Sequence, residues 1–271
     1  MNHSVMKTNF LAVSFALIAA AMISCAGSGP KKNLSPLQFA VVGNTCAESP
    51  FKQPHPDMPR LISALNRSNP AIVIHTGNTI FAGFTSGIRE EDVTRQFKAA
   101  EQVFEQLDRA RHFVPGELDT FNGSTTAFSS FTGKNPYNTF IYGSVLFVVL
   151  NTTDHEPGKI SDEQFSWLCD TLEDSRNESI ILVTYHPIIR MRGYDGPVVE
   201  NAERITMLFQ HYPVRAVISG AGETFSMTEH EGMAYYNLGC VPLFKPCGKD
   251  QNRYYLATFY EDRLIVEGMK L

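Results

Sequence analysis

The sequence contains few cysteines and no long run of basic residues. Five cysteines in 271 residues are too few to indicate a disulfide scaffold. Lysine and arginine number 23 against 28 acidic residues, so a nucleic-acid backbone is not expected as a main partner. Apolar residues make up 43% of the chain and charged residues 19%, which excludes a disordered or collagen-like polymer. The composition indicates an ordinary globular protein.

The apolar run near the N-terminus is too short to span a bilayer. It covers 14 residues, from Phe10 to Ile23, whereas a transmembrane helix needs about 20. Lys7 precedes the run and small residues follow it, which is typical of a secretory signal. The run ends in Met22-Ile23-Ser24-Cys25, which resembles the bacterial lipobox, in which the cysteine becomes acylated. We expect residues 1–24 to be a lipoprotein signal peptide; a plain cleaved signal with an incidental cysteine is the alternative.

The segment after the signal predicts a membrane tether. Residues 25–36 begin with Cys25 and are rich in glycine, serine and proline, as a flexible connection should be. Removing residues 1–24 deletes one lysine and no acid, so the mature chain stays acidic and would not bind anionic lipid through its own surface. Acyl chains on Cys25 would therefore supply the anchor. The expected location is the bacterial cell envelope, outside the cytoplasm.

Four further cysteines leave the disulfide pairing open. Cys46, Cys169, Cys240 and Cys247 allow three pairings, and the sequence does not choose among them. Cys169 falls in an apolar helix pattern and is expected to be a buried thiol. Cys240 and Cys247 are close enough in sequence to pair.

The remaining chain, residues 37–271, is expected to form one domain. Buried strands are indicated at 39–42, 71–74 and 112–115, with helices at 57–66 and 90–109 between them. This alternation predicts a parallel sheet with right-handed crossovers. Further strands are expected at 145–150, 179–185 and 216–219, with a helix capped by Ser161 and another over 198–210. Short antiparallel strands over 233–238, 254–260 and 264–267 complete an α/β architecture of two packed mixed sheets flanked by helices.

Five strand ends carry the residues of chemical interest, because ligands in open α/β sheets bind at the carboxyl ends of strands. They read Gly43-Asn44-Thr45-Cys46, Gly77-Asn78, Gly116-Glu117-Leu118-Asp119, His186-Pro187 and Gly220-Ala221-Gly222-Glu223. Their order and spacing resemble the calcineurin-like metallophosphoesterase family, including its purple acid phosphatase-like members. That family carries Asp-x-His, Gly-Asp, Gly-Asn-His-Asp/Glu, His-Pro and Gly-His-x-His at these places. The resemblance covers roughly residues 37 to 270 and implies an αββα sandwich.

The resemblance also implies a reaction: hydrolysis of phosphate esters by two metal ions, which polarise the phosphoryl group and generate a hydroxide nucleophile. The chain departs from the family at most of the residues that this reaction needs. Asn44, Cys46, Asn78, Glu117, Leu118, Ala221 and Glu223 occupy altered positions, and only His186 keeps the family residue. His186 is thus the candidate catalytic residue. Asn78, at the position of the bridging aspartate, offers an amide oxygen without charge, and Leu118, at the position of the general acid, cannot transfer a proton.

These changes predict loss of the dinuclear centre. The expected cofactor is none, or one weakly bound Zn, Mn or Fe ion on the degenerate positions Asn44, Cys46, Asn78, Glu117, His186 and Glu223. A mononuclear site on His186, Glu117 and Glu223 is chemically feasible, but a hydrogen-bonded histidine beside solvated glutamates is the favoured interpretation. Cys46 lacks an identifiable base for nucleophilic catalysis.

Three functions therefore remain open. The leading hypothesis is a catalytically impaired, lipid-anchored member of the family that binds an unknown small-molecule or protein ligand at the old cleft, where Arg190 and Arg192 could pair with an anion. The alternative is an active hydrolase with an atypical mononuclear site, so enzyme status is undecided. A purely structural envelope lipoprotein is the third possibility. His75 is expected to be a satisfied core residue.

Overall fold

A computed structural model describes residues 36–52, 54–222, 224–239 and 253–271. All of them belong to one compact unit, Leu34–Leu271. Four features expected from the sequence lie outside the described residues: the signal segment, the acylation site Cys25, the close pair Cys240 and Cys247, and the site candidate Glu223. Within the ranges that are described, no helix combines the length and apolar character needed to cross a membrane.

The first sheet has five strands in the order β11-β10-β1-β2-β3. They are β1 (Leu37–Val42), β2 (Ile72–His75), β3 (Ala110–Phe113), β10 (Arg253–Tyr260) and β11 (Arg263–Lys270). Strands β1, β2 and β3 run parallel, as the alternation of strands and helices predicts, and β10 and β11 add an antiparallel hairpin beside β1.

The second sheet has six strands in the order β4-β5-β6-β7-β9-β8. They are β4 (Asn138–Tyr142), β5 (Val145–Val149), β6 (Ser179–Thr184), β7 (Val214–Ser219), β8 (Ser226–His230) and β9 (Met233–Asn237). The expectation that 233–238 forms only antiparallel pairs is wrong, because β9 pairs parallel to β7 and antiparallel to β8. The unpredicted strand β8 brings the chain back along the sheet edge, so β9 enters in the direction of β7.

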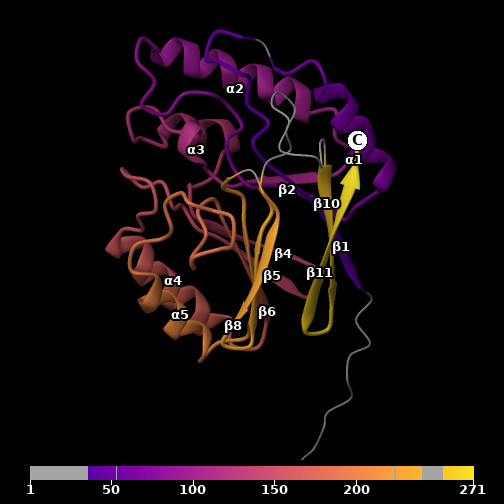
Figure 1. Ribbon diagram of the computed structural model, residues 1–271, viewed down its shortest axis with the longest axis vertical. Helices are drawn as coiled ribbons and strands as arrows, with labels where there is room; N and C mark the ends of the chain where they lie inside the picture. The colour runs from indigo at the N-terminus through magenta and orange to yellow at the C-terminus, as the bar shows by residue number, and fades with distance from the viewer. Residues whose placement is uncertain (1–35, 53, 223, 240–252) are drawn as a thin grey trace, which may run out of the picture. The chain divides into compact units, whose positions relative to one another are not determined.

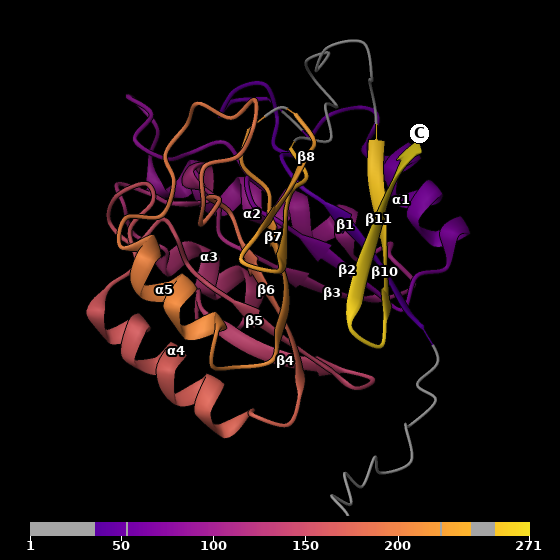
Figure 2. The ribbon, with the colours of Figure 1, turned by 60° about the horizontal axis from the view of Figure 1, so that its bottom comes forward.

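Five α-helices and one short 3₁₀ turn are present among the described residues. They are α1 (Met58–Ser68), α2 (Glu90–Phe104), α3 (Thr126–Thr132), α4 (Asp162–Asp174), α5 (Ala202–Phe209) and the turn Glu117–Asp119. Helices α1 to α3 lie together at the top of Figure 1, and α4 and α5 lie together at its lower left. Figure 2 again places α4 and α5 side by side, on the far side of the strands from α1.

The side chains of β1 show why the sheets pack as layers. Phe39 and Val41 point into the cluster shared with the second sheet, whereas Ala40 and Val42 pack against α1 and α2. A strand whose successive side chains are buried on both faces must be covered on both sides. The αββα sandwich expected from the sequence is therefore confirmed. One large apolar cluster joins the two sheets and the buried faces of α4 and α5, and two smaller clusters lie under α1 to α3.

Three local expectations differ from the structure. Helix α2 ends at Phe104 rather than at Arg109. The predicted end was too late because Leu107 keeps the apolar spacing of the helix but lies in the following turn, where its N–H donates to the Phe104 carbonyl. Helix α5 begins at Ala202 instead of Val198, since the preceding Asn201 is left-handed at φ 32°. Cys169 is only partly buried, because it lies toward the edge of the apolar stripe of α4.

Candidate functional site

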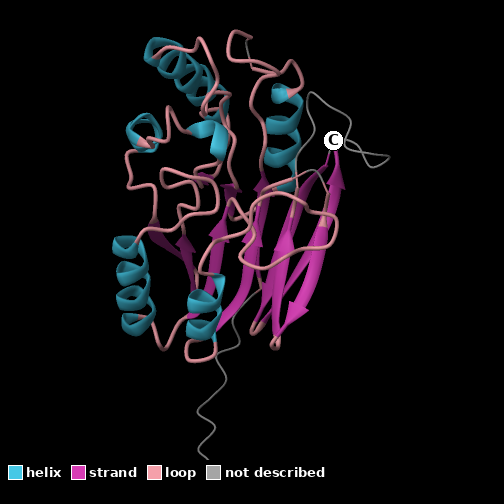
Figure 3. Ribbon diagram, turned by 60° about the vertical axis from the view of Figure 1, so that its left-hand side comes forward, coloured by secondary structure: helices cyan, strands magenta, loops and turns pink. Residues whose placement is uncertain are grey.

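The carboxyl ends of the parallel strands bring the predicted residues to one region. Asn44 follows β1, Asn78 follows β2, Glu117 follows β3 and His186 follows β6. Figure 3 shows loops gathered above the upper ends of the strands. The structure brings Asn44 and Asn78 into direct contact, and it does the same for Glu117 and His186. Two pairs therefore form where the family motifs meet.

The first pair is an asparagine–asparagine hydrogen bond. Asn78 Nδ2 donates to Asn44 Oδ1 at 2.8 Å and to the Tyr185 hydroxyl at 2.7 Å. Asn78 Oδ1 accepts from the Leu118 N–H at 2.9 Å, and Asn44 Nδ2 donates to the Gly220 carbonyl at 2.9 Å. A backbone N–H only donates and a backbone carbonyl only accepts, so these two contacts fix which way each amide faces. The nitrogen of Asn78 necessarily points toward Asn44.

The backbone at both asparagines is left-handed. Asn44 has φ 52° and Asn78 has φ 58°. Asparagine and aspartate tolerate this conformation better than other residues with a side chain, because their short polar groups bond locally. The Asn78 amide is held close against Gly116, where any Cβ would overlap it. The backbone turns that would direct two aspartate side chains into the site are thus retained, but the asparagine amides at these positions carry no charge.

Asp119 is buried beneath this pair and acts as a backbone anchor. Its carboxylate accepts from the N–H groups of Gly116, Asn78, Thr79 and Ile80 at distances between 2.7 and 3.0 Å. Burial raises the pKa of Asp119 to about 7, while the four N–H donors act in the opposite direction. With both oxygens engaged, Asp119 ties the β2–α2 loop to the β3 loop.

The second pair joins His186 to Glu117. His186 Nε2 lies 2.6 Å from Glu117 Oε1, and its Nδ1 lies 2.8 Å from the Thr152 carbonyl. The carbonyl can only accept, and its contact is shorter than the 3.3 Å approach of the Gly158 N–H to the same nitrogen, so Nδ1 carries a proton. His186 is fully buried, whereas the Glu117 side chain is 36% exposed. The imidazole is therefore held from both sides, and Glu117 extends from it toward solvent.

Cys46 is not equipped to act as a nucleophile. It is buried, and burial together with the charge of Asp119 raises the pKa of its thiol to about 12. A thiol in that state is not the reactive thiolate. Arg190 and Arg192 are both exposed, and Arg190 donates to the Gly196 carbonyl at 3.0 Å.

The whole fold has close counterparts among solved structures. A dimetal phosphatase from Danio rerio superposes with TM-score 0.68 at 13% identity, covering 86% of this chain and 95% of that one. The chain adopts the calcineurin-like metallophosphoesterase fold. GAP50 from Plasmodium superposes with TM-score 0.61 at 13% identity, covering 87% and 84% of the two chains. The protein TT1561 from Thermus thermophilus gives 0.53 at 10% identity, covering 86% and 99%. No protein-family model and no curated protein matches the sequence.

The metallophosphoesterase fold implies two metal ions, and the described side chains do not fit them. A metal ligand must present an oxygen or nitrogen lone pair about 2 Å from the ion. Asn78 instead presents N–H donors to Asn44 and Tyr185, and the direct contact between the two amides occupies the space between them. No group of three or more histidine, cysteine, aspartate or glutamate residues with metal-binding geometry occurs in the described ranges.

A cleft opens beside Glu117, on the solvent side of the His186 pair. It is lined by Gly83, Phe84, Glu117, Leu118, Thr120, Gly123, Thr153, His155, Glu156 and Pro157. Phe84 is 67% exposed. Each of the two acids has a basic neighbour, Glu117 in His186 and Glu156 in Lys159. No lysine or arginine is among these lining residues, so the cleft has no unpaired cation to attract a phosphate group.

Two residues of the site were missed in the sequence. Tyr185 contacts a member of each pair: its hydroxyl accepts from Asn78, and its ring packs edge-on against His186. Thr152 contacts the His186 ring through its carbonyl. Tyr185 immediately precedes His186, and its place at the end of a buried strand was the available signal. Thr152 gave none, because a threonine after a buried strand fits many turns. Burial raises the pKa of Tyr185 well above its usual value, with the charge of Glu117 adding to the effect, so the phenol stays protonated.

Proposed function

We propose that this chain is a lipid-anchored binding protein of the cell envelope that uses the metallophosphoesterase fold without its hydrolytic reaction. The hydrogen bond between Asn78 and Asn44 is the observation that carries the proposal. It places an N–H donor where the family reaction needs a bridging anion, and a donor repels a cation instead of binding it. On this proposal the chain retains the cleft of the fold but lacks the metal-binding groups that the hydrolytic reaction requires.

The cleft retains groups that suit ligand binding. Glu117 uses Oε1 for His186 and leaves its second oxygen without a described partner. Phe84 and Leu118 add apolar surface at the opening. A neutral or cationic ligand, either a small molecule or a protein side chain, fits this combination better than a phosphate ester.

An anchoring role is described for one protein of similar fold. GAP50 is described as the anchor in the inner membrane complex of Plasmodium. That role belongs to GAP50, but it makes a non-catalytic role for a chain of this fold reasonable. Acylation of Cys25 would hold the present chain at a membrane, with residues 25–36 as the tether.

Metal analysis and turnover test the proposal directly. The purified chain should hold no pair of tightly bound ions, and it should not hydrolyse p-nitrophenyl phosphate or bis-p-nitrophenyl phosphate with added Mn²⁺, Zn²⁺ or Fe²⁺. An unrelated dimetal phosphatase, assayed in parallel, provides the positive control. Two ions per chain, together with turnover that a chelator abolishes, would overturn the proposal.

A mononuclear hydrolase is the second candidate, favoured by one contact. His186 Nε2 and Glu117 Oε1 lie 2.6 Å apart, so a nitrogen and an oxygen that could both bind a metal ion are already close together. A metal ion would have to separate them, with Glu223 as a third ligand. This candidate requires that His186→Ala and Glu223→Ala each abolish metal binding and activity. It is excluded if neither change alters either property.

A further inference from the structure

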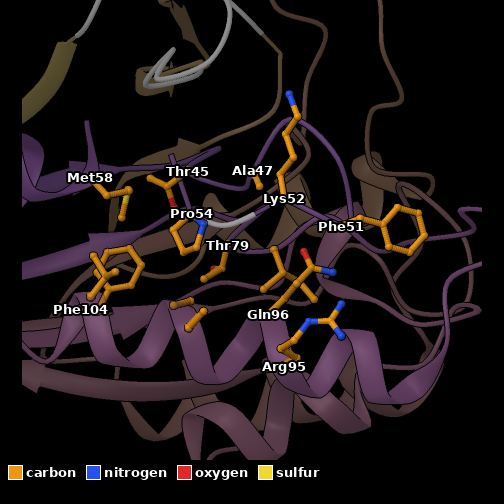
Figure 4. Close-up of a pocket in the computed structure, with 14 residues that line it drawn as sticks. Thr45, Ala47, Phe51, Lys52, Pro54, Met58, Thr79, Arg95, Gln96 and Phe104 are labelled. Carbon is orange, nitrogen blue, oxygen red and sulfur yellow. The ribbon is translucent and has the colours of Figure 1, made fainter. Parts of the chain in front are cut away.

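A second pocket is lined by Thr45 and Thr79, the residues that follow Asn44 and Asn78. It lies between the β1–α1 loop, the β2–α2 loop and helices α1 and α2, and it is partly open to solvent. Part of its wall is apolar, with Met58, Ile80, Ala100 and Phe104 each less than 10% exposed. The polar lining residues are Thr45, Lys52, Thr79, Arg95 and Gln96. Figure 4 shows Met58 and Phe104 at one end of this pocket and Phe51 at the other. None of its lining residues belongs to the cleft beside Glu117.

His75 determines which polar groups the pocket offers. The ring is fully buried, and its Nδ1 accepts from the Gly77 N–H at 3.3 Å, so this nitrogen carries no proton. Burial lowers the pKa of His75 to about 3, so the ring is neutral and its proton resides on Nε2. Nε2 therefore donates to Thr45 Oγ1, which lies 2.8 Å away.

Thr45 is left with an unused donor. Its hydroxyl oxygen accepts from His75, and the hydroxyl makes no other hydrogen bond among the described residues. Thr45 is only 3% exposed and lines the pocket. A buried hydroxyl proton without an acceptor is costly, and an acceptor in the pocket would remove that cost. The pocket thus combines a partly apolar wall with one O–H group that requires an oxygen or nitrogen lone pair.

The charges at the opening cancel. Lys52 pairs with Glu48, and Arg95 pairs with Asp92 at 2.8 Å. The Lys52 side chain extends away from the pocket in Figure 4. Because each of these two cations has an acidic neighbour, with Asp92 shared between Arg95 and Arg89, the opening favours neither an anion nor a cation. A neutral ligand is the best match.

We propose that this pocket binds a small, neutral, largely apolar molecule carrying a carbonyl oxygen, which accepts the hydrogen bond from Thr45. The apolar body lies between Met58, Ile80 and Phe104, and the carbonyl lies at the polar wall formed by Thr45 and Thr79. The site is separate from the cleft of the proposed function, so either proposal can fail without the other.

Acetophenone and ethylbenzene form a matched pair of probes, because they differ in the carbonyl group and share the aromatic body. Spectra of the full chain labelled with ¹³C at the methionine methyl groups report binding: Met58 lines the pocket, and Met207, which is 63% exposed, provides an internal reference. Acetophenone should shift the Met58 signal with saturation, leave Met207 unmoved and bind about 3- to 10-fold more tightly than ethylbenzene.

Two variants make the test specific. Thr45→Val should weaken acetophenone binding about 3- to 10-fold and leave ethylbenzene binding unchanged, since only the hydroxyl is removed. Ala99→Phe, at a half-buried position that lines the pocket, should abolish binding of both probes, whereas Ala127→Phe, at a half-buried position on α3, should not. Circular dichroism confirms that each variant folds. The proposal is overturned if acetophenone leaves Met58 unshifted, if Ala99→Phe binds like the wild type, or if Thr45→Val weakens both probes equally.

Discussion

Replacing Asn78 by aspartate tests the central contact of the site. The substitution keeps the size and the left-handed backbone preference of the side chain, but it replaces the N–H₂ group by a second oxygen. Tyr185 can turn its own proton toward the new oxygen, whereas Asn44 Oδ1 cannot reverse its role, because Asn44 Nδ2 is committed to the Gly220 carbonyl. One buried acceptor loses its donor, at about 1–3 kcal/mol. The carboxylate also lies near Asp119, which bonds the N–H of the same residue.

Together these effects should lower the free energy of unfolding by about 2–4 kcal/mol at pH 7. For a unit of this size, that corresponds to a decrease of about 5–15 °C in Tm. The introduced carboxyl has a folded-state pKa above its unfolded value of about 3.9, because it is buried beside another acid. Its protonated form can donate to Asn44, so the deficit should shrink as the pH falls from 8 to 5.

Thermal and urea unfolding, followed by circular dichroism at several pH values, provide the assay. Asn122→Asp is the matched control, since Asn122 also has a positive φ, 51°, but is exposed. It should change Tm by less than about 2 °C. If Asn78→Asp were as stable as the wild type at pH 7, the assigned orientation of the two amides would be wrong.

Three further predictions concern other parts of the chain. The pKa of the buried His75 is lowered to about 3, so the free energy of unfolding should fall by about 1.4 kcal/mol per pH unit as the pH decreases from about 6.5 toward 3. The free energy of unfolding of His75→Gln should therefore depend less on pH between pH 7 and 5. The variant His112→Asn measures the smaller contribution of the half-buried His112, whose pKa is lowered to about 4. Cys46, with a thiol pKa of about 12, should resist iodoacetamide at pH 8 in the folded chain and react after unfolding. The partly exposed Cys169 should react in both states, and peptide mass spectrometry distinguishes the two cysteines. Rapid labelling of Cys46 in the folded chain would contradict its burial. In bacteria expressing the full chain, Cys25→Ser should abolish incorporation of labelled palmitate and release the protein from membranes, and retention of both properties would exclude the lipobox interpretation.

The sequence predicted the layers of the fold because the buried strands are strongly patterned. The run VLFVVL that contains β5 has no polar residue, so it could only be an inner strand. The edge strands β4 and β8 were not predicted. Their sequences, NTFIY and SMTEH, contain both polar and apolar residues, and most of their side chains are exposed or only partly buried. An edge strand is stabilised by backbone hydrogen bonds to a single neighbouring strand, and such bonds do not require a distinctive amino-acid composition.

For the site, the sequence predicted where residues would meet and which charges were missing. It could not predict that Asn44 and Asn78 bond to each other, because that contact depends on the Leu118 N–H and the Gly220 carbonyl, which belong to two other loops. The pairing of His186 with Glu117 depends in the same way on Thr152, which lies 34 residues from the histidine. Residue identity fixes the chemistry that is available, and long-range backbone geometry decides which atoms meet.

The left-handed backbone at Asn44 and Asn78 limits which residues can replace the family's aspartates. Apart from glycine, few amino acids occupy that conformation without strain, and asparagine alone combines the shape of aspartate with a neutral group. A mutational library at these two sites should therefore yield a narrow set of folded proteins. The same turns would accept restored acids with little rearrangement of the main chain, which makes this protein a ready starting point for rebuilding a metal centre step by step.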